Sequence, residues 1–225
     1  MSKLTRRNFL KTTAAASTVF STFTIGGTKS SGKVIGANDT IRIAVTGLNT
    51  RGTHHINKFS EIENVQITHL IDPDSTLYDA HRKQIHANTG VQPKCIADVR
   101  EALDDKSIDA ISIATPNHWH SLMTIWGAQA GKHVYVEKPM SHDIAEGRIA
   151  VAAQEKYGVV VQHGTQRRSN AGIAGLNEAI HAGKFGKLKI SYGYCCKKRG
   201  GIGMKGPLEA PANLDWNLWR GPADI

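Results

Sequence analysis

Short apolar runs alternate with stretches of helical periodicity from residue 41 to residue 163. The apolar runs, rich in β-branched residues, predict six strands at 41–46, 65–71, 94–96, 108–114, 133–136 and 159–163. Helices are predicted between them, at 54–60 and 75–88 among others, and Asp98 is positioned to cap the helix that holds Val99, Ala102 and Leu103. Leu122, Ile125 and Trp126 form one apolar stripe at i, i+3 and i+4 of another helix. Because strands joined by crossover helices pair in parallel, the pattern predicts an α/β fold with a doubly wound parallel sheet.

The pattern changes after residue 163. Asn170 is positioned to cap a helix that carries Ile173, Leu176 and Ile180, and residues 188–194 predict one further strand. One helix and one strand cannot bury a core of their own. We therefore expect residues 164–225 to be the beginning of a second, α+β domain that is truncated, and residues 38–163 to form the first domain.

The first 37 residues are predicted to be a targeting signal and a linker rather than part of the folded domain. The segment TRRNFLK at 5–11 resembles the twin-arginine export signal, and a weakly apolar stretch follows it. The alternative is a basic tail without a targeting role. The signal predicts export to the periplasm by the twin-arginine machinery.

The net charge of +9 arises mostly from this leading segment. Six of the 28 basic residues precede the first acidic residue, so the rest of the chain carries 22 basic residues against 19 acidic ones, a net charge of +3. No basic stripe with interleaved aromatic residues follows, so nucleic acid is not an expected partner.

A glycine loop links the first strand to the first helix. Gly47 and Gly52 have the outer spacing of the dinucleotide fingerprint, and Asn49 takes the place of its middle glycine. The first glycine permits a tight turn and the last permits close packing of helix on strand. Asn49 tolerates a left-handed backbone better than most residues. Thr50 and Arg51 complete the loop, whose helix N-terminus would attract phosphates, and Arg51 would add its positive charge beside them.

Asp72 ends the second strand, 20 residues after Gly52. A carboxylate there can accept hydrogen bonds from both ribose hydroxyls of NAD and would repel the 2′-phosphate of NADP. We therefore expect NAD as the cofactor, with NADP as the alternative. The competing interpretation is a glycine turn followed by a helix-capping Asp-Pro-Asp.

Three further motifs stand at the ends of later strands: TPNHWH at 115–120, EKP at 137–139 and HGTQRR at 163–168. With the fingerprint, they resemble the glucose–fructose oxidoreductase/inositol dehydrogenase/MocA family, in its exported, sugar-related form. The resemblance covers residues 40 to about 200. It implies a Rossmann domain and hydride transfer between NAD(P) and a sugar or polyol hydroxyl or carbonyl.

The resemblance also implies roles for single residues. The cofactor would be lined by Thr115, Pro116, Asn117 and His120, and Glu137 would help position its nicotinamide end. Lys138 would contact the nicotinamide ribose and relay the proton of the substrate hydroxyl. Gln166 and Arg167 are candidates for substrate contacts. His118 and His120 lie at i and i+2 and do not share a helix face, so no metal site is expected.

One family feature is missing from this sequence. The family completes proton transfer with an Asp and a His spaced D-x-x-x-H, and no such pair follows Lys138. Two alternatives therefore stay open beside the dehydrogenase: a glycoside hydrolase of the same superfamily that uses NAD transiently, and a catalytically incomplete nucleotide-binding module. Family members pair through the second domain, so we expect a homo-oligomer only where that domain is complete.

Overall fold

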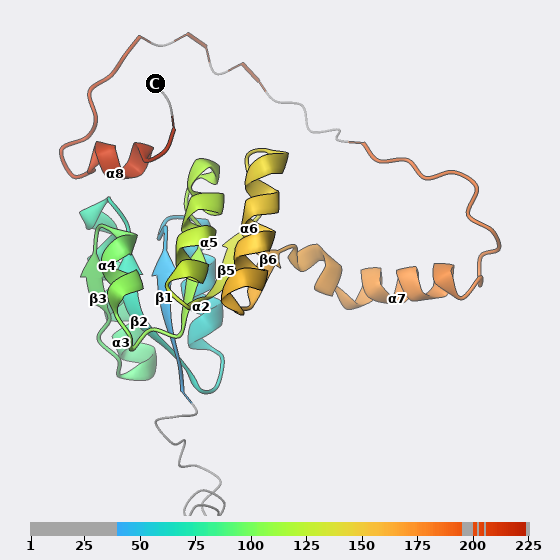
Figure 1. Cartoon of the computed structure of the whole chain (residues 1–225), viewed down its shortest axis with the longest axis horizontal. Coiled ribbons are helices and arrows are strands. Elements are labelled where there is room, and N and C mark those ends of the chain that lie inside the picture. The colour runs from blue at the N-terminus through green and yellow to red at the C-terminus, as the bar shows by residue number, and fades with distance from the viewer. Residues whose placement is uncertain (1–39, 195–199, 202, 205, 224–225) are drawn as a thin grey trace, which may run out of the picture.

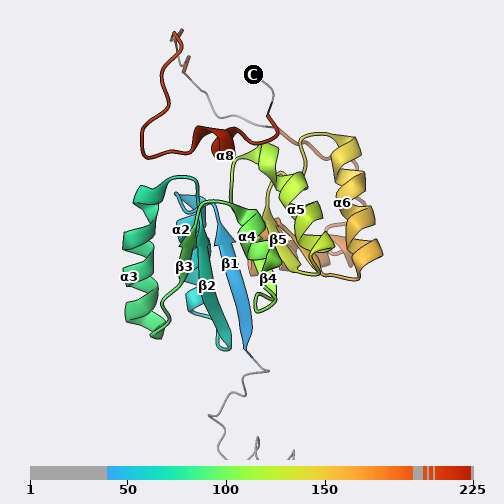
Figure 2. The same ribbon diagram turned by 60° about the vertical axis from the view of Figure 1, so that its left-hand side comes forward.

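A computed structural model describes residues 40–194, 200–201, 203–204 and 206–223, and the export signal predicted at residues 5–11 lies outside them. Six parallel strands form one sheet in the order β3-β2-β1-β4-β5-β6, which confirms the predicted doubly wound architecture (Figures 1 and 2). The strands are β1 (Ile41–Thr46), β2 (Val65–Ile71), β3 (Lys94–Ile96), β4 (Ala110–Ile113), β5 (His133–Glu137) and β6 (Val161–Gly164).

Helices cover both faces of this sheet, so its strands are apolar on both sides. One buried cluster joins the sheet to α2 (Arg51–Ser60) and α3 (Tyr78–Thr89). A second joins the opposite face to α4 (Val99–Asp104) and α5 (His120–Gln129), with α6 (Ile144–Tyr157) packed beside α5. Short 3-10 turns complete the domain: η1 (Ser75–Leu77), η2 (Asn117–Trp119) and η3 (Gln166–Ser169).

The pairing of β1 with β2 contains one irregularity. Ile43 pairs with Ile67 and Ala44 with His69, so Thr68 is an extra residue in β2. The extra residue shifts the side-chain alternation by one position. Ile67 and Leu70 consequently lie in the same buried cluster although they are three residues apart.

Several predicted boundaries differ from the observed ones by a few residues. The first helix starts at Arg51 instead of residue 54, because it begins directly at the end of the glycine loop. The stretch predicted as a helix at 75–88 is divided into η1 and α3. Asp98 caps α4 as predicted, with its side chain accepting a hydrogen bond from the backbone N–H of Arg100.

The chain after β6 agrees with the prediction only in part. Helix α7 (Ala171–His181) is capped by Asn170 as expected, and it projects away from the sheet (Figure 1). The strand predicted at 188–194 is wrong: these residues are exposed, and no strand among the described residues pairs with them. An alternating pattern makes a strand only where a neighbour supplies its hydrogen bonds. The domain boundary at residue 163 stays a prediction.

A short helix near the end of the chain was not predicted. α8 (Trp216–Arg220) is capped by Asp215, whose side chain accepts a hydrogen bond from the N–H of Leu218. It lies across the end of the sheet at which β1, β2 and β4 finish (Figure 2). Within the described residues, no helix is long and apolar enough to cross a membrane.

Candidate active site

The loop between β1 and α2 turns sharply at Gly47, whose φ of 77° lies in the left-handed region. A β-carbon at Gly47 would lie 2.7 Å from the backbone carbon of Ala114, and one at Gly52 would lie 1.7 Å from the carbonyl oxygen of Gly47. Any side chain at these positions would therefore collide with backbone. The two glycines provide the tight turn and the close helix–strand packing for which the fingerprint uses them.

The middle of the loop differs from the expectation. Thr50, with a φ of 34°, is the loop residue with the left-handed backbone, and Asn49 does not use the conformation that it tolerates. Asn49 instead supports the turn with its side chain, whose Oδ1 accepts a hydrogen bond of 2.8 Å from the N–H of Thr50. α2 follows at once, with no acidic residue in its first turn. The positive end of its dipole is therefore available to an anion.

Asp72 ties the end of β2 to this loop. Its Oδ2 accepts a hydrogen bond of 2.8 Å from the N–H of Leu48, and its Oδ1 accepts one of 2.9 Å from the N–H of Asp74. Burial raises the pKa of the Asp72 carboxyl. A carboxylate has about four acceptor positions, so two used internally leave capacity for a ribose hydroxyl.

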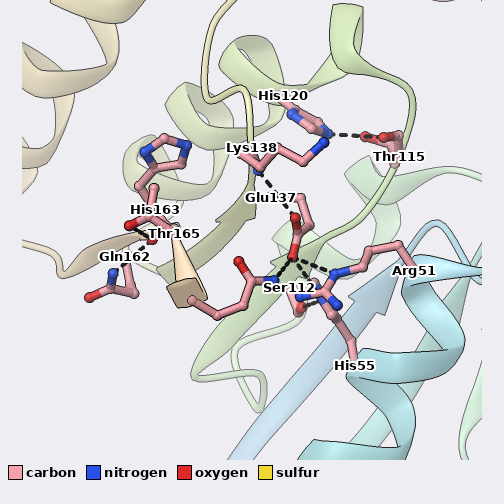
Figure 3. Close-up of polar contacts among 11 residues, drawn as sticks. Arg51, His55, Ser112, Thr115, His120, Glu137, Lys138, Gln162, His163 and Thr165 are labelled. Carbon is pink, nitrogen blue, oxygen red and sulfur yellow. Dashed lines mark hydrogen bonds and ion pairs between the residues drawn. The ribbon is translucent and has the colours of Figure 1, made fainter. Parts of the chain in front are cut away.

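Glu137, the last residue of β5, is buried and is the centre of a polar network (Figure 3). Its Oε1 accepts hydrogen bonds from Arg51 Nε at 2.6 Å, His55 Nε2 at 3.1 Å and Gln166 Nε2 at 3.0 Å. Arg51 thus points at a carboxylate of the protein, and its predicted place beside phosphates stays a prediction. Gln166, predicted to contact substrate, is also held by Glu137.

Burial and hydrogen bonding shift the pKa in opposite directions at both Glu137 and His55, and hydrogen bonding prevails at Glu137 while burial prevails at His55. Burial by itself raises the pKa of Glu137, but the hydrogen bonds from His55 and Arg51 outweigh it and hold that pKa below its usual value. Burial lowers the pKa of His55, so its ring is neutral near pH 7. With Nε2–H donating to Glu137, the His55 Nδ1 accepts from the hydroxyl of Ser112 at 2.7 Å.

Sequence reasoning missed His55 and Ser112. The signal for His55 was its position four residues after Arg51, which places both on one face of α2. The signal for Ser112 was a polar residue inside the otherwise apolar strand β4. Neither signal names its partner, because the contacts join residues 57 and 82 positions apart.

His120 joins the two motif loops that follow β4 and β5. Its buried ring lies with Nε2 2.9 Å from the carbonyl oxygen of Thr115 and Nδ1 2.5 Å from that of Pro139. The histidine of the TPNHWH motif thus clamps its own loop against the EKP loop, in which the Lys138–Pro139 peptide bond is cis.

Two cavities lie side by side at the carboxyl ends of the strands. The first, of about 420 Å³, includes these predicted site residues: Gly47, Asn49, Thr50, Arg51, Asp72, Thr115 and Pro116. The second, of about 1040 Å³, includes these: Arg51, Thr115, Asn117, His120, Glu137, Lys138, Gln166 and Arg167. Because the two cavities share Arg51 and Thr115, the predicted residues surround one continuous groove. Gly52 is buried in α2 and lines neither cavity.

Lys138 lies in the second cavity, directly after β5. In Figure 3 its side chain extends toward the His120 end of the site, away from the Glu137 carboxylate. Within the part of the chain that the structure describes, no group of three or more His, Cys, Asp or Glu residues is arranged to hold a metal ion.

A family model described as an oxidoreductase family with an NAD-binding Rossmann fold, Gfo/Idh/MocA, matches residues 41–165. The chain belongs to this family. The observed groove fits that cofactor, because Gly47 lets backbone approach a pyrophosphate and the Asp72 carboxylate faces the first cavity. The predicted family, fold and nucleotide cofactor are confirmed.

Single relatives place the match in the first part of longer proteins. The scyllo-inositol 2-dehydrogenase (NAD(+)) of Bacillus subtilis is 32% identical over 148 residues, which are 65% of this chain and 42% of that protein. A glycosyl hydrolase family 109 protein of Shewanella is 32% identical over 163 residues, 65% of this chain and 36% of that protein. The chain therefore spans about two fifths of the length of these relatives.

A solved structure is likewise similar over only part of its length. The WlbA dehydrogenase of Bordetella pertussis, crystallised with NADH and UDP-GlcNAcA, is 27% identical with a TM-score of 0.58. The similarity covers 67% of this chain and 42% of that one.

Proposed function

We propose that the whole protein is an NAD-dependent dehydrogenase that acts on a hydroxyl or carbonyl carbon of a sugar or polyol. The position of Lys138 carries this proposal: it stands in the cavity that shares Arg51 and Thr115 with the nucleotide end of the groove. In an open parallel sheet, ligands bind outside the carboxyl ends of the strands, where both cavities lie. The dehydrogenases among the relatives support the same reaction class.

The two ends of the groove would have different roles. NAD, when bound, supplies the hydride acceptor or donor. Asp72, Thr115 and Pro116 would hold its adenosine half, and Asn117 would lie beside the nicotinamide half. Glu137 and His120 are positioning residues. The Glu137 carboxylate already accepts a hydrogen bond from Arg51, and the His120 ring lies between the two motif loops.

Lys138 is the group that would move the proton. During oxidation its neutral amine takes the proton of the substrate hydroxyl, and during reduction the ammonium returns it. Arg167 lines the same cavity and would hold further substrate hydroxyls. NADP is the less favoured cofactor, because Asp72 would face its 2′-phosphate.

Replacement of Lys138 tests this assignment. Lys138→Ala in the whole protein is expected to lower turnover about 10²- to 10⁴-fold, while the dissociation constant for NAD changes little. The matched control is Lys156→Ala, which removes an exposed lysine of α6 that lines neither cavity. Turnover equal to that of the unsubstituted protein would refute the role of Lys138.

The glycoside hydrolase is the second candidate, and the Shewanella relative favours it. The two reactions differ in their net products. NADH that accumulates at 340 nm with a sugar or polyol supports the dehydrogenase. Cleavage of a glycoside with no net NADH supports the hydrolase. Binding of NAD without either reaction would leave the nucleotide-binding module.

We also propose that the protein is exported to the periplasm by the twin-arginine machinery, on the strength of Arg6 and Arg7 and the segment that surrounds them. This route exports folded proteins, so NAD would be bound before export. A native mass spectrum of the protein from the periplasm should show retained dinucleotide and reveal the oligomeric state. Confinement to the cytoplasm would contradict the proposal.

A further inference from the structure

A segment far along the chain closes one side of the first cavity. Residues 213–221, here called the cover segment, include α8 and run across the end of the sheet (Figure 2). Leu214, Leu218 and Trp219 of this segment line the 420 Å³ cavity together with Asp72 and Thr115. None of these three apolar residues belongs to the motifs that predict the nucleotide site.

One edge of the cover segment is bound to the loop that follows β2. Asn213 donates from Nδ2 to Asp74 Oδ1 at 2.8 Å, and Asp215 donates its backbone N–H to the carbonyl oxygen of Pro73 at 3.0 Å. Asp74 and Leu214 also form an antiparallel bridge. This loop directly follows Asp72, so the first anchor lies at the ribose side of the cavity.

The other edge is bound to the loop that follows β4. The indole Nε1 of Trp119 donates to the carbonyl oxygens of Leu218 and Trp219, both at 3.1 Å. His118 Nε2 lies 3.1 Å from the Trp219 carbonyl oxygen. Gly221 then presses on the Trp119 ring so closely that a β-carbon there would lie 2.1 Å from Cζ2. The second anchor therefore belongs to the TPNHWH motif.

The cover segment thus bridges the two loops between which the adenosine half of the cofactor would lie. It brings apolar side chains to a cavity that already has Leu77, Val99 and Met123 in its walls. Adenine has flat apolar faces, and burying them between such side chains is favourable. The interactions come from two sides of the cavity, so the segment cannot leave without breaking hydrogen bonds to both loops.

We propose that the cover segment is the adenine-side wall of the nucleotide site, in which Leu218 and Trp219 contact the adenosine half and hold the cofactor in place. This inference rests on the NAD site described above and adds residues that the family motifs do not contain. It also gives the TPNHWH motif a second role, because His118 and Trp119 hold the wall while Thr115 and Pro116 line the cavity.

The test uses the whole protein and measures the binding of each half of the cofactor separately. Leu218→Ala and Trp219→Ala are expected to weaken AMP binding about tenfold and to speed NAD release about tenfold, because apolar contact with the base is lost. Binding of nicotinamide mononucleotide should stay unchanged. The matched control is Leu208→Ala, which removes an exposed leucine that lines neither cavity.

Two further outcomes separate the possible failures. AMP affinity and NAD release that are unchanged in both variants would overturn the wall and leave the NAD site standing. Absence of NAD binding by the unsubstituted protein would overturn the site itself. Should Trp219→Ala fail to fold, Asn213→Ala cuts one tether without removing an apolar contact, and it is also expected to speed NAD release.

Discussion

At the scale of single residues, Gly47 and Gly90 show how context decides what a glycine does. Both have a left-handed backbone, with φ of 77° and 74°. At Gly90, which ends α3, a β-carbon would meet nothing within 4 Å, whereas at Gly47 it would meet the backbone of Ala114 and Thr115 at 2.7 Å. Of these two glycines, only Gly47 is required both by its conformation and by its surroundings.

Substitution of these two glycines should separate the two requirements. Gly90→Ala is expected to cost about 1 kcal/mol of unfolding free energy, the strain of a left-handed alanine. Gly47→Ala adds a collision with the backbone that directly follows β4, so it is expected to cost several times as much and to abolish NAD binding. Urea unfolding measures the loss of stability in each variant, and NAD titration measures the loss of cofactor binding. Equal stability of the two variants would contradict the close approach at Gly47.

The sequence indicated the candidate site residues that directly follow strands, but it did not indicate the polar contacts of residues inside helices and strands. Asp72 was predicted because it ends the second strand at the fingerprint spacing, whereas the roles of Thr115, Glu137 and Lys138 were implied by the family resemblance of motifs that follow strands. His55 was missed because its partners come from β4 and β5. The direction of the Arg51 side chain could not be predicted either, since it depends on a carboxylate 86 residues away.

At the scale of elements, the sheet was predictable because each strand is buried on both faces and flanked by helices. The error at residues 188–194 and the missed helix α8 have a common physical reason. Both segments are short and depend on contacts with distant parts of the chain, so local pattern does not decide their structure. α8 carried a local signal in Asp215 before it and Gly221 after it, but a helix of five residues does not form alone.

His55 fastens α2 to β4 and β5, and this contact should depend on pH. Its pKa is lowered by burial from 6.5, so the unfolded state binds a proton more readily than the folded state. The stabilisation from neutral His55 is complete above pH 6.5 and is lost as the pH falls through the folded pKa. His69, whose pKa burial also lowers, adds to the same trend.

Urea unfolding between pH 7.5 and pH 5.5 checks this expectation. The unfolding free energy of the unsubstituted protein should decrease as the pH is lowered. In the His55→Gln protein this decrease should be less steep, and the two slopes should differ by at most about 1.4 kcal/mol per pH unit. His54→Gln, at the exposed neighbour on the same helix, is the matched control. A His55→Gln protein with the same slope as the unsubstituted protein would contradict a buried neutral His55.

At the scale of the whole molecule, one groove crosses the carboxyl ends of the strands from Asp72 to Gln166. Its floor comes from the sheet domain that the family model matches, and one wall comes from residues 213–221. The relatives carry the remaining three fifths of their length beyond what this chain matches.

A crystal structure of the protein with NAD tests the central claim most directly. We expect the adenosine half beneath Leu218 and Trp219 with its ribose at Asp72, and the nicotinamide ribose within hydrogen-bonding reach of the Lys138 amine, at about 3 Å. A dinucleotide bound with its nicotinamide at the Asp72 end, or outside the groove, would contradict the account.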